Sequence, residues 1–184
     1  MFMSVRVTEE AHQLGQVYLS IRSLPRRIMH LPRRRNRHST DLPLTEAGRQ
    51  GAEALGRYLA GRKFDLVLSS PLARAAETCR LAGYGEVARF TDDLMEWDYG
   101  EYEGLRPEDI LKKRPGWTIW NDGVPGGETV EQAGERARNV VGLTEAADGD
   151  AAVFSHSHLL RILAACWLGL PLTQVGISIS IRPR

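Results

Sequence analysis

Chemically reactive side chains in this sequence follow short apolar runs that are typical of buried strands. The run at 66–69 leads into a helix predicted to begin at Pro71, with Arg74 in its first turn. The run at 151–155 is followed directly by His156. A helix N-terminus offers free backbone N–H groups and a positive dipole end. Together with the Arg74 guanidinium, these donors predict an anion site, with phosphate as the expected ligand.

Acidic and aromatic residues alternate in the stretch 94–104, and Glu96 is the candidate general acid within it. A carboxyl group held among aromatic rings is expected to have a raised pKa, which suits proton donation. Most acidic residues of such a stretch simply solvate a loop, and His158 is expected to be a capping or surface residue. The aromatic residues either cover a substrate or anchor local packing: Trp97, Tyr99, Trp117 and Trp120.

Strand-like and helix-like segments alternate along the chain. This order predicts an α/β fold with a mostly parallel central sheet covered by helices on both faces. Ligands of such sheets bind beyond the carboxyl ends of the strands. We therefore expect three strand ends to meet at one crevice: Ser20 to Arg22, Ser69 to Arg74, and Ser155 to His158. The expected strands are 16–21, 64–69, 87–90, 151–155 and 176–181, and the expected helices are 45–61, 71–81, 107–114, 129–141 and 159–168.

The length of 184 residues fits a single domain, in which residues 91–128 form a long excursion typical of a lid or binding segment. Hydrophobic residues make up 42% of the chain and charged residues 26%, as in a soluble globular protein. The start has no signal-peptide pattern, and the apolar segment 159–170 is too short to span a bilayer. Two cysteines without disulfide or metal spacing fit a reducing, cytoplasmic protein without a metal.

Seven arginines and no acidic residue lie between residues 20 and 40. Such a block binds nucleic acid or an acidic partner, or is simply a solvated segment. It has no interleaved aromatic residues, which argues against nucleic acid as the partner.

Several motifs in order resemble the histidine phosphatase (phosphoglycerate mutase-like) superfamily, in particular its bacterial acid phosphatase and sugar phosphatase branch. The resemblance implies the three-layer α/β/α fold of that family, a phosphomonoesterase acting through a phosphohistidine, and no cofactor. It also implies that Arg74 and His156 stabilise the phosphoryl oxygens and that Glu96 protonates the leaving oxygen. Tyr99 and Ser157 are further candidates for substrate contact. The matching segments are 40–49, 69–78, 96–104, 117–123, 127–128, 154–156 and 167–171.

The family's nucleophilic histidine belongs to an Arg-His-Gly run after the first strand, and this run is missing. Here Ser20 to Arg22 follow that strand, and His12, His30 and His38 are weak substitutes, so the nucleophile is unknown. Ser157 replaces the glycine usual after the second histidine, and residues 1–39 and 172–184 are atypical, with the family's C-terminal pattern cut short. A shifted reading frame and a pseudoenzyme both explain these departures. The prediction is a phosphatase impaired in turnover, and the alternative is a non-catalytic binder of a phosphorylated ligand or acidic partner.

Overall fold

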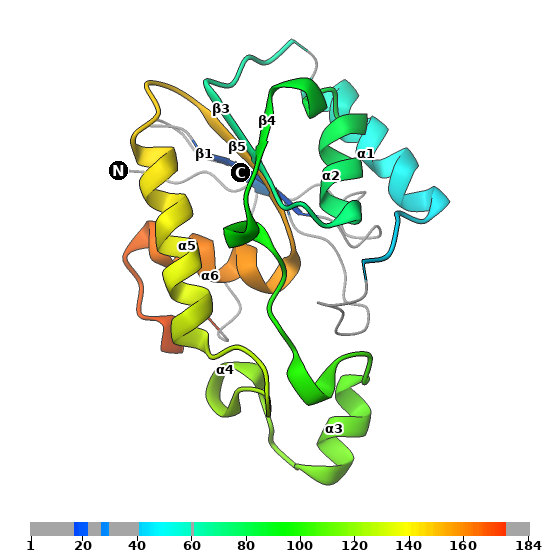
Figure 1. The fold of residues 1–184 in the computed structure, drawn as a ribbon, viewed down its shortest axis with the longest axis vertical. Helices are drawn as coiled ribbons and strands as arrows, with labels where there is room; N and C mark the ends of the chain where they lie inside the picture. The colour runs from blue at the N-terminus through cyan, green and yellow to red at the C-terminus, as the bar shows by residue number, and fades with distance from the viewer. Residues whose placement is uncertain (1–16, 22–26, 30–40, 60, 176–184) are drawn as a thin grey trace.

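The computed structural model describes residues 17–21, 27–29, 41–59 and 61–175 (Figure 1). These residues form one five-stranded sheet in the order β2-β1-β5-β3-β4. Strand β3 pairs in parallel with both β5 and β4, whereas β1 pairs antiparallel with β5 and β2. The bounds are β1 Val17–Ile21, β2 Arg27–Met29, β3 Leu66–Ser69, β4 Ala88–Phe90 and β5 Ala151–Ser155.

Helices cover both faces of this sheet, which confirms the predicted α/β fold class (Figure 1). Helices α1 and α2 pack on one face, and α5 and α6 pack on the other. Short 3-10 helices occupy 85–87, 92–94, 100–102 and 172–174. The α-helices are α1 Glu46–Leu59, α2 Ala73–Leu81, α3 Pro107–Lys113, α4 Ile119–Asp122, α5 Val130–Glu145 and α6 Ser157–Leu168.

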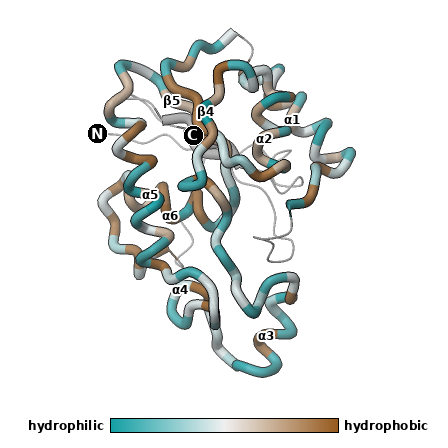
Figure 2. Tube along the Cα trace, viewed as in Figure 1, coloured by the Kyte–Doolittle hydropathy of each residue, from teal (hydrophilic) through white to brown (hydrophobic). Residues whose placement is uncertain are grey.

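The central strands are apolar on both faces because both faces are covered. Leu68 and Val153 belong to the cluster formed with α5 and α6, whereas Val67 and Phe154 belong to the cluster formed with α1 and α2. Successive strand residues point to opposite faces, so an uninterrupted apolar run fills both clusters at once. Strand β5 is accordingly coloured as hydrophobic in Figure 2.

The expectation that the first strand ends at the site is wrong. Val17 pairs with Ser155 and Ile21 pairs with Ala151, so β1 runs against β5. Its carboxyl end at Ile21 therefore lies at the opposite end of the sheet from the ends of β3 and β5, and Arg22 lies outside the described residues. The reason is that side-chain alternation fixes which face a residue occupies but carries no information on strand direction.

Helix starts follow local capping signals where such signals exist. Thr45 accepts the Gly48 N–H at 3.1 Å at the start of α1, as expected. Thr129 and Gln132 form a capping box before α5. Helix α2 begins at Ala73 rather than Pro71, and α6 begins at Ser157 rather than two residues later.

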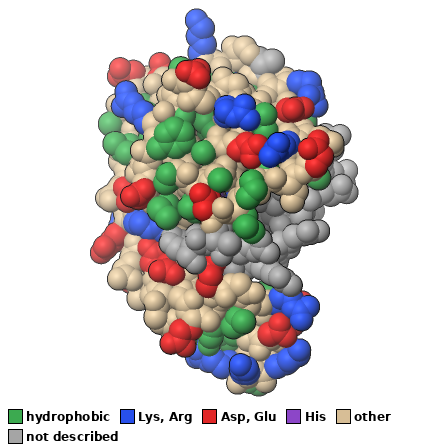
Figure 3. All heavy atoms as spheres, turned by 45° about the vertical axis from the view of Figure 1, so that its right-hand side comes forward, with side chains coloured by type: hydrophobic (Ala, Val, Ile, Leu, Met, Phe, Trp, Pro, Cys, Tyr) green, Lys and Arg blue, Asp and Glu red, His purple; other side chains and the backbone are tan. Residues whose placement is uncertain are grey.

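Residues 91–128 leave the sheet after β4 and return at α5, and α3 and α4 lie at the lower end of Figure 1. The expected strand 176–181 and the arginine-rich block lie outside the described residues, apart from β2 and the end of β1. Over the described residues that Figure 3 shows, acidic and basic side chains are intermixed. None of the described helices is long and apolar enough to cross a membrane.

Candidate phosphate site

The parallel pairing of β3 with β5 places the residues that follow these two strands next to each other. Ser69 lies opposite Phe154 in the register, and the Ser70 N–H donates to the Phe154 carbonyl at 2.9 Å. His156 comes two residues after Phe154, and Arg74 lies in the first turn of α2. The carboxyl ends of β3 and β5, two of the three predicted strand ends, therefore meet at the same end of the sheet.

His156 contacts both the serine and the arginine of the neighbouring strand end. Its Nε2 atom lies 2.9 Å from Ser70 Oγ, and its Nδ1 atom lies 3.4 Å from Arg74 Nη2. A guanidinium only donates hydrogen bonds, so in a neutral His156 ring Nδ1 accepts from Arg74 and Nε2 donates to Ser70. An anion bound between Arg74 and His156 would favour the imidazolium form, which donates from both nitrogens.

The predicted contribution of the α2 N-terminus to anion binding is wrong. The Asp41 carboxylate accepts the Ala73 N–H at 2.6 Å, and Ser70 Oγ accepts the Leu72 N–H at 3.3 Å. A negative side chain from 32 residues earlier in the chain already caps this helix end. The site therefore depends on the side chains of Arg74 and His156 rather than on the helix dipole.

Glu96 accepts a backbone N–H at the start of α6, as Asp41 does at the start of α2. One carboxylate oxygen, Oε1, accepts the N–H of Leu159 in the first turn of α6 at 3.2 Å and the N–H of Trp97 at 3.0 Å. Glu96 is only 7% exposed. The helix N-terminus and two backbone donors thus hold the carboxylate beside the two histidines of α6.

The raised pKa expected for Glu96 is wrong in direction. Burial does raise it, but the nearby charges of His158 and His156 and the two backbone hydrogen bonds lower it by more, so the pKa of Glu96 lies below its usual value. The aromatic neighbours in the sequence correctly indicated that Glu96 is buried. The histidines that oppose the effect of burial on its pKa come from a segment about 60 residues away, so the local sequence did not reveal them. The lowered pKa makes Glu96 a carboxylate at neutral pH.

This direction predicts how stability depends on pH. A lowered folded-state pKa means that ionised Glu96 stabilises the fold above the unfolded pKa of about 4.3, and that this contribution is lost as the pH falls through the folded-state value. We expect Glu96→Gln to lower the free energy of unfolding by about 2 kcal/mol at pH 7, because an amide accepts hydrogen bonds more weakly than a carboxylate. Urea unfolding at a series of pH values should show this difference shrinking below about pH 4. Glu101→Gln, an exposed glutamate of the same segment, is the control; a difference independent of pH would contradict the prediction.

His158 is a site residue that sequence reasoning missed, since it was expected to be a cap or a surface residue. Its Nδ1 atom lies 2.6 Å from the Tyr99 hydroxyl, and its ring packs against Tyr99 and Trp120. Tyr99 itself is 2% exposed and lies in the interior, next to Glu96. Ser157 begins α6 directly after His156.

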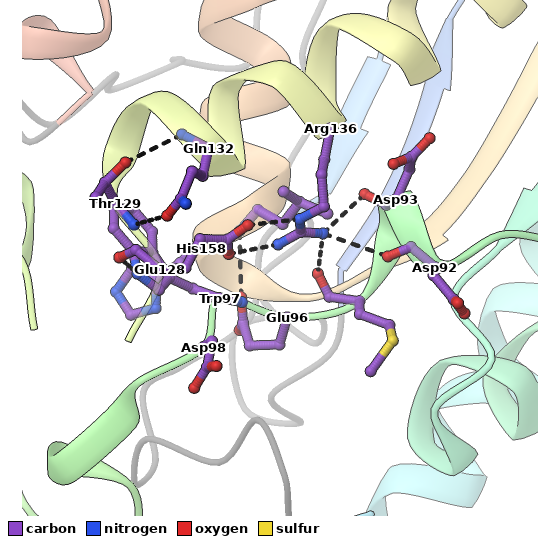
Figure 4. Close-up of polar contacts among 12 residues, drawn as sticks. Asp92, Asp93, Glu96, Trp97, Asp98, Glu128, Thr129, Gln132, Arg136 and His158 are labelled. Atoms are coloured by element: carbon purple, nitrogen blue, oxygen red, sulfur yellow. Dashed lines mark hydrogen bonds and ion pairs between the residues drawn. The ribbon is translucent and has the colours of Figure 1, made fainter. Parts of the chain in front are cut away.

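Glu128 and Arg136 form a second missed element, which holds the segment carrying Glu96 (Figure 4). The two side chains make a bidentate ion pair, with both N–O distances 2.7 Å. Arg136 Nη1 also donates to the carbonyls of Met95 at 2.9 Å and Asp93 at 3.0 Å. The Glu128 carbonyl accepts from the Trp97 indole at 2.8 Å. The spacing of eight residues between the pair gave no sequence signal, because one partner precedes α5 and the other lies within it.

The aromatic residues of the excursion pack against one another and against the core. Trp97 is fully buried, and Trp120 packs edge-on against it with ring centroids 5.6 Å apart. The Trp117 indole donates to the Gly123 carbonyl at 2.9 Å and its ring packs on Tyr102. Within the described part of the chain, no group of three or more His, Cys, Asp or Glu residues could hold a metal ion.

Comparison with known proteins gives a consistent family match. Residues 31–179 match the family model described as histidine phosphatase superfamily (branch 1). The chain is 38% identical over 144 residues to an acid phosphatase of Mycobacterium tuberculosis, covering 76% of this chain and 70% of that protein. It spans 60% or less of the length of several other curated proteins that it matches.

Solved structures agree with this match. One from an open reading frame of Mycobacterium tuberculosis has a TM-score of 0.70 and 34% identity, covering 81% of this chain and 86% of that one. A mycobacterial glucosyl-3-phosphoglycerate phosphatase in complex with inorganic phosphate has a TM-score of 0.68 and 28% identity, covering 77% and 76% of the two chains.

Proposed function

Since this chain belongs to branch 1 of the histidine phosphatase superfamily, we propose that it binds the phosphoryl group of a small phosphate monoester between Arg74 and His156. The observation that carries the proposal is the contact between the Arg74 and His156 side chains across the ends of β3 and β5, with Glu96 held beside them. Arginine and imidazolium donate to the oxygens that carry charge in phosphoryl transfer. Glu96 would protonate the leaving oxygen once it gains a proton.

Turnover by the family's route needs a histidine that attacks phosphorus and forms a phosphohistidine. The segment after β1 lacks the family's motif and lies outside the described residues, and β1 itself ends at the opposite end of the sheet from the ends of β3 and β5. His12, His30 and His38 lie outside the described residues. We therefore propose a phosphatase site with impaired turnover. The same observation favours the second candidate, a binder of phosphorylated ligands or acidic partners that does not turn them over.

The direct test of the binding site is thermal stabilisation by inorganic phosphate. We expect Arg74→Gln to weaken phosphate binding at least tenfold, because it removes a charge-assisted hydrogen-bond donor. Arg80→Gln removes the same charge from the exposed end of the same helix and should bind as the wild type does. Equal affinities for the two variants would overturn the proposed site.

Release of phosphate from an aryl phosphate separates the two candidate functions. A phosphatase should release phosphate and carry an acid-labile phosphohistidine, and both should be lost in His156→Ala and Glu96→Ala. Phosphate binding without release, and without a labelled histidine, identifies the binder.

A further inference from the structure

A hydrogen-bonded chain runs from Glu96 through Tyr99 to His158. The Tyr99 hydroxyl lies 2.6 Å from His158 Nδ1, and the two rings pack edge to face with centroids 5.7 Å apart. Trp120 packs on His158 from another side at 5.3 Å. Tyr99 is almost completely buried, whereas His158 is half-buried. The chain thus connects a buried carboxylate to a histidine nearer the surface.

The direction of these hydrogen bonds follows from the single proton of the tyrosine hydroxyl. Burial and the charge of Glu96 raise the pKa of Tyr99, and the hydrogen bond to Glu96 raises it further, so Tyr99 keeps its proton and donates it to the carboxylate. Having donated it, the hydroxyl can only accept from its other partner. His158 Nδ1 therefore carries a proton and donates it to Tyr99. The order is Nδ1–H of His158 to Tyr99 Oη, and Oη–H of Tyr99 to the Glu96 carboxylate.

We propose that Glu96, Tyr99 and His158 share one mobile proton, which moves from His158 to Glu96 when a phosphate dianion binds; this rests on the proposed function. In the step, the Nδ1–H bond breaks as a new O–H bond forms on Tyr99. The former hydroxyl proton of Tyr99 passes to the Glu96 carboxylate. His158 is left neutral, Tyr99 is unchanged, and Glu96 becomes a carboxylic acid. The transfer along these three residues takes no proton from solvent.

Electrostatics supply the driving force. The positive charges of His158 and His156 favour the carboxylate form of Glu96. A dianion held by Arg74 and His156 would offset the positive charge of His156 and repel the carboxylate. His156 contacts Arg74, whereas His158 contacts Tyr99 and Trp120, so the anion would act first on His156. Moving the proton to Glu96 removes the negative charge that the dianion repels.

Two further charged groups act on Tyr99 in opposite directions. Glu103 and Arg74 both influence Tyr99, the first raising its pKa and the second lowering it. Burial and Glu96 raise it further, so the tyrosine relays a proton without itself ionising. Glu96 consequently gains the proton that a general acid needs only when a phosphate is bound.

The ring nitrogens of His158 report the proton directly, without any need for turnover. The full chain is labelled with 15N-histidine and observed by NMR at about pH 6.5, near the ordinary pKa of histidine. Sodium sulfate, a tetrahedral dianion that does not titrate in this range, is added at constant ionic strength, and His158→Gln assigns the signals. We expect His158 to carry two ring protons without sulfate and to lose the Nδ1 proton at saturation, while His156 carries two ring protons with sulfate bound.

The variants separate the proton transfer from the site itself. Tyr99→Phe breaks the relay, so sulfate should bind while His158 keeps both protons. Tyr102→Phe removes a hydroxyl from the same segment that contacts Arg114 instead, and it should behave as the wild type does. A His158 that is neutral in the empty protein, or still charged with sulfate bound, would overturn the shared proton and leave the phosphate site standing. No sulfate effect at His156, or one that survives Arg74→Gln, would overturn the site and the relay together.

Discussion

Replacing Arg136 with methionine is expected to lower the free energy of unfolding by about 3 kcal/mol, since it leaves Glu128 as a shielded charge without its partner. The side chains of Arg136 and Glu128 are 20% and 13% exposed, so water compensates little. The change also removes the donors to the Met95 and Asp93 carbonyls. Urea unfolding followed by circular dichroism measures the loss. A decrease in Tm of about 10 °C should accompany it.

Two further variants identify the cause of this loss. Arg138→Met changes an exposed arginine two residues along the same helix and should cost less than about 0.5 kcal/mol. The double variant Arg136→Met, Glu128→Met removes both charges, and it should be less destabilised than the sum of the two single variants. Additive losses, or an equal loss in Arg138→Met, would show that the ion pair does not hold this segment.

Replacing Gly100 with alanine is the second change with a large expected effect. Gly100 has a φ of +46°, which an L side chain adopts at a cost of about 1 kcal/mol. A Cβ atom there would also overlap the Pro125 carbonyl and the backbone at Gly126 and Gly127. These are backbone atoms that cannot rotate away, which adds about 2 kcal/mol. We expect a total loss of about 3 kcal/mol and a displaced Glu96 segment.

Gly104 offers a matched control in the same excursion. Its φ is +74°, and a Cβ atom there would meet no atom within 4 Å. Gly104→Ala should therefore cost only the conformational part, about 1 kcal/mol. Chemical denaturation of both variants separates steric overlap from backbone conformation. Equal losses would mean that the contact between the 98–102 and 124–128 segments contributes nothing.

Both changes act on the segment that carries Glu96, although neither residue is part of the Arg74 and His156 pair. The Asp98 carbonyl accepts from the Glu128 N–H at 3.0 Å, and the Glu101 N–H donates to the Pro125 carbonyl at 2.9 Å. Arg136 holds the other side of Glu96 through Met95. The position of the carboxylate thus depends on backbone contacts between segments about 30 residues apart.

Local patterns in the sequence were sufficient for the elements and for part of the site. Apolar runs predicted β3 and β5, and capping residues predicted the starts of α1 and α5, because these signals act between neighbours in the chain. Arg74 and His156 were found because they follow buried strands. Parallel pairing of adjacent strands then brings their ends together without further information.

Tertiary structure alone decided the remaining features, because each depends on groups that are distant in the sequence. It decided the antiparallel direction of β1 and the capping of α2 by Asp41, which replaces the predicted helix-dipole site. It also decided the ionisation of Glu96, since burial and opposing histidines shift its pKa in opposite directions. The sequence by itself thus determined the fold class and the cationic pair of the phosphate site. Which charges and hydrogen bonds surround that pair depended on long-range packing, whose distances no local pattern encodes.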